Sequence, residues 1–295
     1  MKDYLIEFFK KCEYEKEDAD YLLTAYDKIS ESTEARDVWL KALSLYDADV
    51  DCDFKALLEM AREAAEIVSI HPYTAELLLL CSMSRRLEKE YEKRGLSADM
   101  YYGGILDLRY KLEECKLIKG IVGIFVGFWL DRLFNVSRFM LGRHQFQIIN
   151  FGYTYEKNGI KLNPESKVID VHIARTGTPL DEESCDKSFA LACEFFKGQT
   201  DIPTAFVCNS WLLYPEHEKM LSHNTNVYKF MSRFDIFRFG KDVGRENLWR
   251  LFDTDEKRWD KLPADSSFRR AYIEHLKNGG NVGWGHGIFI VKSEE

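Results

Sequence analysis

The stretch KVIDVHIARTGTPLDEESCDKSFALACEFF, residues 167–196, predicts a strand, a short loop and a helix in succession. Residues 168–173 form a β-branched run in which only Asp170 and His172 are polar, a pattern typical of a largely buried strand. The end of the stretch predicts a helix over residues 180–197 with one apolar face for packing on a sheet, made by Phe189, Ala192, Cys193 and Phe196. We therefore expect a sheet layered with helices around this stretch.

The loop Arg175-Thr176-Gly177-Thr178 joins the strand to the helix. We expect Thr178 to be the N-cap and Pro179 the first helical residue, followed by three carboxylates at residues 181–183. A helix start of this kind exposes backbone N–H groups that often bind anions. The carboxylates, however, already complement the helix dipole and would repel a phosphate. An anion-binding loop and a well-capped structural helix both remain open.

Composition and charge limit the classes of protein to which the chain can belong. Its 295 residues suffice for a sizeable core and suggest two domains. With 45% apolar and 31% charged residues, it resembles an ordinary globular protein and not a low-complexity chain. The net charge of −8 comes from residues 1–120, which hold 18 Lys/Arg against 26 Asp/Glu. This acidic part argues against nucleic-acid binding, which needs a basic face.

Cysteine usage and hydropathy indicate the compartment. The seven cysteines are scattered without a CxxC pair, which predicts buried free thiols and no metal site. The chain opens in a charged amphipathic pattern instead of a signal peptide. Its most apolar run, residues 120–130, has 11 residues, whereas a membrane span needs about 20. We expect a cytoplasmic protein without a membrane partner; the sequence does not indicate an oligomeric state.

Helical periodicity dominates the first part of the chain. Apolar stripes at helical spacing predict a helix bundle, with segments at residues 18–29, 33–46, 54–70 and 74–94. We place the domain boundary after residue 118, so that an all-helical domain, 1–118, precedes a second domain, 119–295. A further helix is expected over residues 117–141, in which glycines 120, 123 and 127 would allow close packing.

The period changes from 3.6 to 2 in the second part, which predicts a mixed α/β or α+β domain. Besides residues 168–173, strands are expected at 145–155, 160–162, 204–213, 226–239 and, after a Gly-rich loop, within 279–291. A turn is expected at residues 156–159. Besides residues 180–197, helices are expected at 215–221, 245–252 and 266–277.

Four segments resemble a known family: WLDRLFNVSRFMLGRHQFQI (129–148), VHIARTGTPLDEESCDKSFALACEFF (171–196), FVCNSWLLYPE (206–216) and TNVYKFMSRFDI (225–236). Together they resemble the two-domain acyltransferases that join an N-acyltransferase N-terminal helical domain to a GNAT-like C-terminal domain. The resemblance implies an all-helical domain followed by a GNAT-like mixed sheet. It also implies acyl-coenzyme A as co-substrate, without a metal.

In GNAT enzymes a loop of the form [QR]xxGx[GA] after the fourth strand wraps the pyrophosphate of acyl-coenzyme A. The resemblance places this loop at Ile173, Arg175, Thr176, Gly177 and Thr178. The sequence departs from the pattern, because Gly177 follows Arg175 by only two residues and the next residue, a proline, has no N–H to donate.

The polar residues of the central strand are candidates for chemistry. His172 and Asp170 share one strand face, which on a GNAT-like sheet would line the acyl or acceptor cleft. His172 would then take a proton from the nucleophile, with Asp170 beside the substrate. The alternative is a histidine that is hydrogen-bonded within the sheet.

A second polar group, Cys208-Asn209-Ser210-Trp211, interrupts an apolar strand, which costs free energy unless these side chains are partnered or functional. Strand alternation predicts that Cys208 and Ser210 face one way, and Asn209 and Trp211 the other. We take Cys208 and Ser210 as candidate catalytic residues, including a Cys208–His172 pair. Asn209 and Trp211 are candidates for substrate binding.

Arg138, His144 and Gln145 lie at the expected helix-to-strand junction and are candidates for holding an anionic substrate group, the alternative being a solvated surface. The triplet Gly283-x-Gly285-x-Gly287 precedes a terminal strand, so it predicts a bulge or tight turn instead of a dinucleotide site. Walker A, HExxH, GxSxG and EF-hand patterns do not occur.

These observations lead to a prediction and an alternative. The prediction is a GNAT-like acyltransferase that moves an acyl group from acyl-coenzyme A to an amine or hydroxyl of a small-molecule acceptor by direct attack. The alternative is a non-catalytic small-molecule binding protein that keeps the fold but has lost coenzyme A binding, as the acidic helix start and the altered loop suggest.

Overall fold

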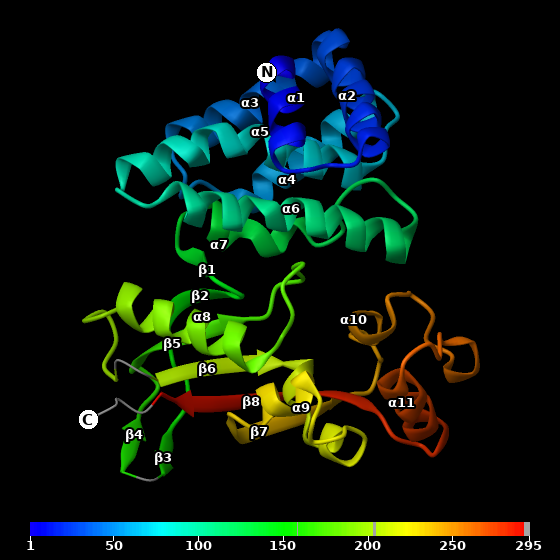
Figure 1. Ribbon diagram of the computed structural model, residues 1–295. Coiled ribbons are helices and arrows are strands. Elements are labelled where there is room, and N and C mark those ends of the chain that lie inside the picture. The colour runs from blue at the N-terminus through cyan, green and yellow to red at the C-terminus, as the bar shows by residue number, and fades with distance from the viewer. Residues whose placement is uncertain (158, 203–204, 292–295) are drawn as a thin grey trace. The chain divides into compact units, whose positions relative to one another are not determined.

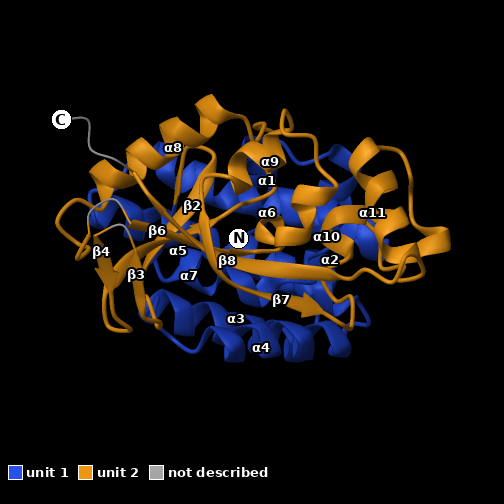
Figure 2. Cartoon of the chain, turned by 90° about the horizontal axis from the view of Figure 1, so that it is seen from below, with its two compact units in different colours: residues 1–139 blue, residues 140–295 orange. Residues whose placement is uncertain are grey.

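The computed structural model describes residues 1–157, 159–202 and 205–291 (Figure 1). It divides into two compact units, Met1–Phe139 and Met140–Glu295, which Figure 2 shows in separate colours. The first unit is helical, and the second is built on a mixed sheet, which confirms the predicted fold class. Within the described residues, no helix combines the length and the apolar character that crossing a membrane requires.

The first unit holds α1 (Lys2–Lys11), α2 (Lys16–Glu31), α3 (Thr33–Ala48), α4 (Phe54–Ile67), α5 (Pro72–Lys93), α6 (Ala98–Lys119), the 3₁₀ helix η1 (Gly127–Leu130) and α7 (Asp131–Phe134). Side-chain caps begin several of these helices: Ser32 Oγ, Asp53 Oδ1 and Ser97 Oγ each accept from the backbone N–H three residues later. Helix α5 is buried almost continuously from Thr74 to Ser84, so the other helices pack around it.

The prediction of one helix over residues 117–141 is wrong. Helix α6 ends at Lys119, because Gly120 adopts a left-handed conformation (φ +68°) that terminates the helix. The chain then passes so close to α5 that a Cβ on Gly123 would lie 2.5 Å from the backbone carbon of Tyr73. Only the short η1 and α7 follow before the first strand.

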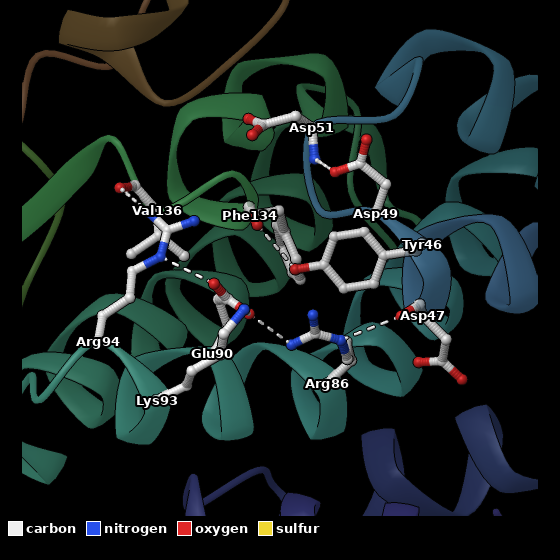
Figure 3. A network of polar contacts seen from close by, with 10 residues as sticks. All are labelled: Tyr46, Asp47, Asp49, Asp51, Arg86, Glu90, Lys93, Arg94, Phe134 and Val136. Atoms are coloured by element: carbon white, nitrogen blue, oxygen red, sulfur yellow. Dashed lines mark hydrogen bonds and ion pairs between the residues drawn. The ribbon is translucent and has the colours of Figure 1, made fainter.

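The units divide after Phe139, later than the position after residue 118 that the sequence indicated. The reason is that the segment after α6 stays in the helical core, where Leu130 and Phe134 are buried. Tyr46 Oη donates to the Phe134 carbonyl at 2.7 Å, and Arg94 Nη1 donates to the Val136 carbonyl at 3.2 Å (Figure 3). Glu90 holds the arginine by accepting from Arg94 Nε at 2.9 Å.

The second unit contains a six-stranded sheet of order β1-β2-β5-β6-β8-β7 and a separate hairpin of β3 and β4. The strands are β1 (Arg138–Leu141, which spans the division between the units), β2 (His144–Asn150), β3 (Tyr155–Lys157), β4 (Ile160–Leu162), β5 (Lys167–His172), β6 (Ala205–Ser210), β7 (Asp235–Asp242) and β8 (Val282–Ile290). Strands β5 and β6 pair in parallel, while β2/β5, β6/β8 and β7/β8 are antiparallel.

Helices connect these strands. They are α8 (Glu182–Phe195), the 3₁₀ helices η2 (Trp211–Leu213) and η3 (Pro215–Lys219), α9 (Asn226–Met231), α10 (Trp249–Phe252), the 3₁₀ helix η4 (Trp259–Lys261) and α11 (Ser267–Lys277). Helix α8 begins later than expected, because Asp181, and not Thr178, caps it through a 2.8 Å bond from Ser184 N to Oδ1. Pro179 therefore lies in the loop.

Three expected strands differ from the structure. The one expected at residues 204–213 ends at Ser210, where η2 begins. The prediction of a strand at residues 226–239 is wrong in its first half. This part forms α9, which Thr225 caps because its Oγ1 accepts from Tyr228 N. The strand at residues 145–155 ends at Asn150. Two further expectations reach outside the described residues, the turn at Asn158 and the strand start at Thr204.

The two faces of the sheet are covered differently. Helix α8 runs along one face (Figure 1), where Phe189 contacts Phe206 and Phe289 with ring centroids 4.9 and 5.1 Å apart. On the other face, which we call the hairpin face, Val168, Val207 and Ile288 pack with buried side chains of the β3–β4 region. Polar residues follow these apolar ones along the same face and form the candidate site.

Candidate functional site

The strand register places a row of polar residues on the hairpin face. Residues paired across neighbouring strands share a face. Asp170 pairs with Val207, so His172 and Asn209, each two residues further along, lie on the hairpin face as well. Asn209 pairs with His286, and His286 pairs with Arg238. On the other side of β5, Gln145 and Gln147 of β2 pair with His172 and Asp170.

His172 and Asp170 form a hydrogen-bonding pair. The His172 Nε2 atom lies 3.0 Å from Asp170 Oδ2, and Gln147 Nε2 donates to the same carboxylate oxygen at 2.8 Å. Both side chains are largely buried, with 16% of His172 and 12% of Asp170 exposed. Gln147 Nε2 also lies 2.9 Å from His172 Nε2, so both the carboxylate and the amide contact this ring nitrogen. In the tautomer whose Nε2 proton is donated to Asp170, Nδ1 keeps its lone pair and can accept a proton.

The pairing of β5 with β6 stops beside this pair of residues. Two positions are paired, Ile169 with Phe206 and Asp170 with Val207, although both strands continue further in the described part of the chain. Among the described residues, the register of β5 with β6 therefore ends before His172 and Asn209. In a parallel sheet this is where an extended ligand can be inserted between two strands.

His286 was missed by the sequence analysis. Its side chain is buried beside Phe237 (ring centroids 4.9 Å apart) and Tyr153 (5.2 Å). Burial lowers the pKa of His286; the Asp170 carboxylate opposes this shift, and the Arg238 guanidinium adds to it. His286 is therefore neutral at pH 7 on the same face as His172. The alternation of residues 284, 286 and 288 in a terminal strand could have indicated it.

The glycines around His286 were interpreted wrongly as a bulge or tight turn. Gly283, Gly285 and Gly287 lie inside the regular strand β8. They give the η2 segment room to approach: a Cβ on Gly285 would lie 2.0 Å from the Leu213 carbonyl oxygen, and one on Gly283 would lie 2.3 Å from the Tyr214 ring. The bulge of the sheet lies in β7, between Ile236 and Arg238.

The loop from Ile173 to Thr178 is held by contacts within the second unit. Arg175 Nη1 donates to Asp253 Oδ1 at 2.8 Å, and the Ala174 carbonyl accepts from Arg143 Nη1 at 2.8 Å. Thr176 Oγ1 accepts from the backbone N–H of Thr178 at 3.2 Å, next to Gly177. These contacts order the loop. Coenzyme binding by Ile173, Arg175, Thr176, Gly177 and Thr178 stays a prediction.

The Cys208–His172 pair is contradicted by the strand register. Cys208 shares its face with Phe206, opposite to His172, and its side chain is fully buried. Burial raises the pKa of the Cys208 thiol well above its usual value, which disfavours the thiolate that a nucleophilic cysteine needs. Ser210 Oγ accepts from Leu212 N at 3.2 Å and thereby caps η2.

Trp211 does not share a face with Asn209, because β6 ends at Ser210 and Trp211 begins η2. Its ring contacts His217 with centroids 5.8 Å apart and packs with the helices α10 and α11. Asn209, in contrast, is exposed on the hairpin face. The proposed use of Asn209 in substrate binding therefore agrees with its position, whereas Trp211 lies elsewhere in the unit.

Arg138, His144 and Gln145 occupy three different environments. Arg138 is buried in the first unit, where Nη1 donates to the Trp129 carbonyl at 3.0 Å. His144 is buried on the α8 face among phenylalanine rings, and its ring nitrogens have no hydrogen-bond partner in the described chain. Burial lowers the pKa of His144 to about 3, so this buried side chain carries no positive charge at pH 7 to attract an anion. Only Gln145 lies beside His172.

The described residues contain no group of three or more His, Cys, Asp or Glu side chains that could hold a metal ion. The hairpin face itself offers four kinds of polar side chain for chemistry. These are a carboxylate-bound histidine, a neutral histidine, amides and a guanidinium.

Comparisons with known proteins match most of the chain. A family model described as "N-acyltransferase N-terminal domain" matches residues 3–136, and one described as "GNAT-like C-terminal domain" matches residues 139–289. Among solved structures, the chain is similar to an acyltransferase in complex with decanoyl-CoA and teicoplanin (19% identity, 98% of this chain and 99% of that chain, TM-score 0.65). It is also similar to an acyltransferase in complex with CoA and 10C-teicoplanin, with the same four values. No curated protein matches the chain.

Proposed function

The chain belongs to the family of the GNAT-like C-terminal domain, here preceded by an N-acyltransferase N-terminal domain, and from this premise we propose that it is an acyltransferase. The reaction transfers an acyl group from acyl-coenzyme A to an amine or hydroxyl of a small-molecule acceptor. The observation that carries this proposal is the His172–Asp170 pair at the point where the pairing of β5 with β6 stops. The end of the strand pairing beside a side chain that can accept a proton supports binding of an extended donor next to a catalytic base.

The mechanism is direct attack. The acceptor nitrogen or oxygen forms a bond to the thioester carbonyl carbon, and the carbon–sulfur bond breaks to release the coenzyme as thiolate. The proton of the nucleophile goes to His172 Nδ1 and then to the thiolate. Asp170 fixes the ring through Nε2 and stabilises the charge that the imidazole gains. The two relatives described above, which bind CoA or decanoyl-CoA, support this donor class.

The experiment separates binding from chemistry. Isothermal titration with coenzyme A and octanoyl-coenzyme A measures binding, and release of free thiol in a broad amine screen measures transfer. His172→Ala is expected to keep coenzyme binding within about threefold and to lower kcat roughly 10²–10⁴-fold. Absence of coenzyme binding at millimolar concentration would overturn the proposal and favour the binding protein without coenzyme A. Undiminished transfer by His172→Ala would exclude the proposed base.

A further inference from the structure

Arg238 is an exposed arginine on the hairpin face, and aromatic side chains of the same face surround its guanidinium. Its Nη1 donates to Tyr153 Oη at 2.8 Å, and its guanidinium carbon lies 5.2 Å from the Tyr153 ring centroid and 5.7 Å from that of Trp284. Two aromatic faces and one hydrogen bond fix the orientation of the guanidinium and leave other N–H donors for a ligand.

In the part of the chain that the structure describes, the charge of Arg238 is not paired with a carboxylate. Among the described residues, no carboxylate lies within ion-pair distance of it. Asp235, on the same strand, accepts instead from Lys157 Nζ and from Tyr155 Oη, both at 2.8 Å. The paired neighbour of Arg238 is His286, whose lowered pKa keeps it neutral at pH 7. A fixed cation without a counter-ion is a favourable partner for an anion.

The position of Arg238 relates it to the candidate reaction centre. It ends the row that runs from His172 through Asn209 and His286, one residue on each of β5, β6, β8 and β7. Three inter-strand steps separate the backbones of His172 and Arg238 by at least about 14 Å, because β5 and β6 no longer pair at His172. The two side chains can therefore contact opposite ends of one extended molecule.

We propose that Arg238 binds an anionic group, a carboxylate or a phosphate, of the substrate whose reacting end lies at His172. This inference rests on the proposed function. A carboxylate would belong to the acceptor and would define it as an extended amine with a remote acidic group. A phosphate would belong to coenzyme A, whose pantetheine arm also separates its thioester from its phosphates.

The experiment titrates the full chain with three probes: coenzyme A, triglycine, and triglycinamide, which lacks the carboxylate. The variants are Arg238→Gln and Arg238→Lys. The matched control is Arg250→Gln, because Arg250 is also an exposed arginine over an aromatic ring, 4.4 Å from the Trp249 centroid. Circular dichroism and a thermal unfolding curve verify that each variant is folded.

We expect Arg238→Gln to weaken binding of one anionic probe by roughly tenfold to a hundredfold, while Arg250→Gln leaves it unchanged. If Arg238→Gln loses affinity for coenzyme A, the anionic group is a phosphate. If it loses affinity for triglycine while its affinity for triglycinamide is unaffected, the group is a carboxylate. Arg238→Lys should recover only part of the affinity, because it cannot bind in bidentate fashion.

Two outcomes overturn the inference. In the first, Arg238→Gln binds coenzyme A and triglycine as tightly as the wild type does; in the second, the wild type binds neither of these two probes. Its failure differs from failure of the proposed function. If the wild type transfers acyl groups and Arg238→Gln keeps both this transfer and the wild-type binding of the probes, only the inference is rejected. Binding of triglycine through Arg238 without any acyl transfer rejects only the proposed function.

Discussion

The Nε2 atom of His172 lies 3.0 Å from Oδ2 of Asp170, two residues earlier on the same face of β5. A carboxylate in this position selects the imidazole tautomer and stabilises the imidazolium. We therefore expect Asp170→Asn to lower kcat by at least about 10²-fold with little change in the KM for acyl-coenzyme A, because the amide favours the opposite tautomer. Steady-state kinetics of thiol release measure both constants.

The control for this substitution is Asp265→Asn, which changes an exposed carboxylate paired with Arg269 at 2.8 Å. It should leave kcat unchanged. If Asp170→Asn transfers acyl groups as fast as wild type, the Asp170–His172 pair is only a structural element of the sheet.

Cys208 provides the second prediction, because the register puts its thiol on the face opposite to His172. Cys208→Ala should retain kcat and lower the free energy of unfolding by about 1 kcal/mol, the cost of a small cavity at a fully buried position. Kinetics and urea unfolding measure the two effects. A loss of kcat by more than tenfold in folded Cys208→Ala would restore the thiol as a reacting group.

The sequence predicted the fold class and the strand–loop–helix, since the apolar periods of residues 168–173 and of α8 are strong local signals. It placed His172 and Asp170 together because alternation within one strand is local too. It could not place Cys208 relative to His172, because that depends on the register of β5 against β6. Likewise, Thr225 and Ser210 cap helices in segments where hydrophobic patterns alone suggested longer strands.

His144 gives a prediction of pH dependence. Its folded-state pKa of about 3, lowered first by burial and then by the charges of Arg143 and Arg233, lies below the ordinary value of 6.5. Between these values the unfolded chain binds more protons than the folded one, so stability should fall as pH decreases from 6.5 towards 3. His144→Leu should reduce this loss. It should also stabilise the protein at pH 7 by about 1 kcal/mol, since two buried nitrogens without partners disappear.

Urea unfolding at several pH values between 4 and 7 measures both effects of His144→Leu. His223→Gln serves as control, because His223 is exposed and stacks on Tyr228 with centroids 4.1 Å apart. This control should follow the wild-type pH dependence. An unchanged pH dependence in His144→Leu would mean that His144 is solvated or hydrogen-bonded in the folded protein.

Gly285 gives the last prediction, which concerns the support of the site by η2. A Cβ at this position would lie 2.0 Å from the Leu213 carbonyl oxygen, so either β8 or η2 must move. Gly285→Ala should therefore lower the free energy of unfolding by about 3 kcal/mol, a typical cost of overpacking at a rigid contact. It should also reduce kcat, because β8 carries His286 beside Asn209.

The matched control is Gly244→Ala, whose Cβ would lie 3.1 Å from Glu246 Oε1, the end of a flexible exposed side chain. It should change stability by less than about 0.5 kcal/mol. Equal unfolding midpoints for Gly285→Ala and Gly244→Ala would show that η2 yields easily to the added methyl group. In that case the glycines of β8 would not be required for the close approach of η2, and the position of His286 would not depend on it.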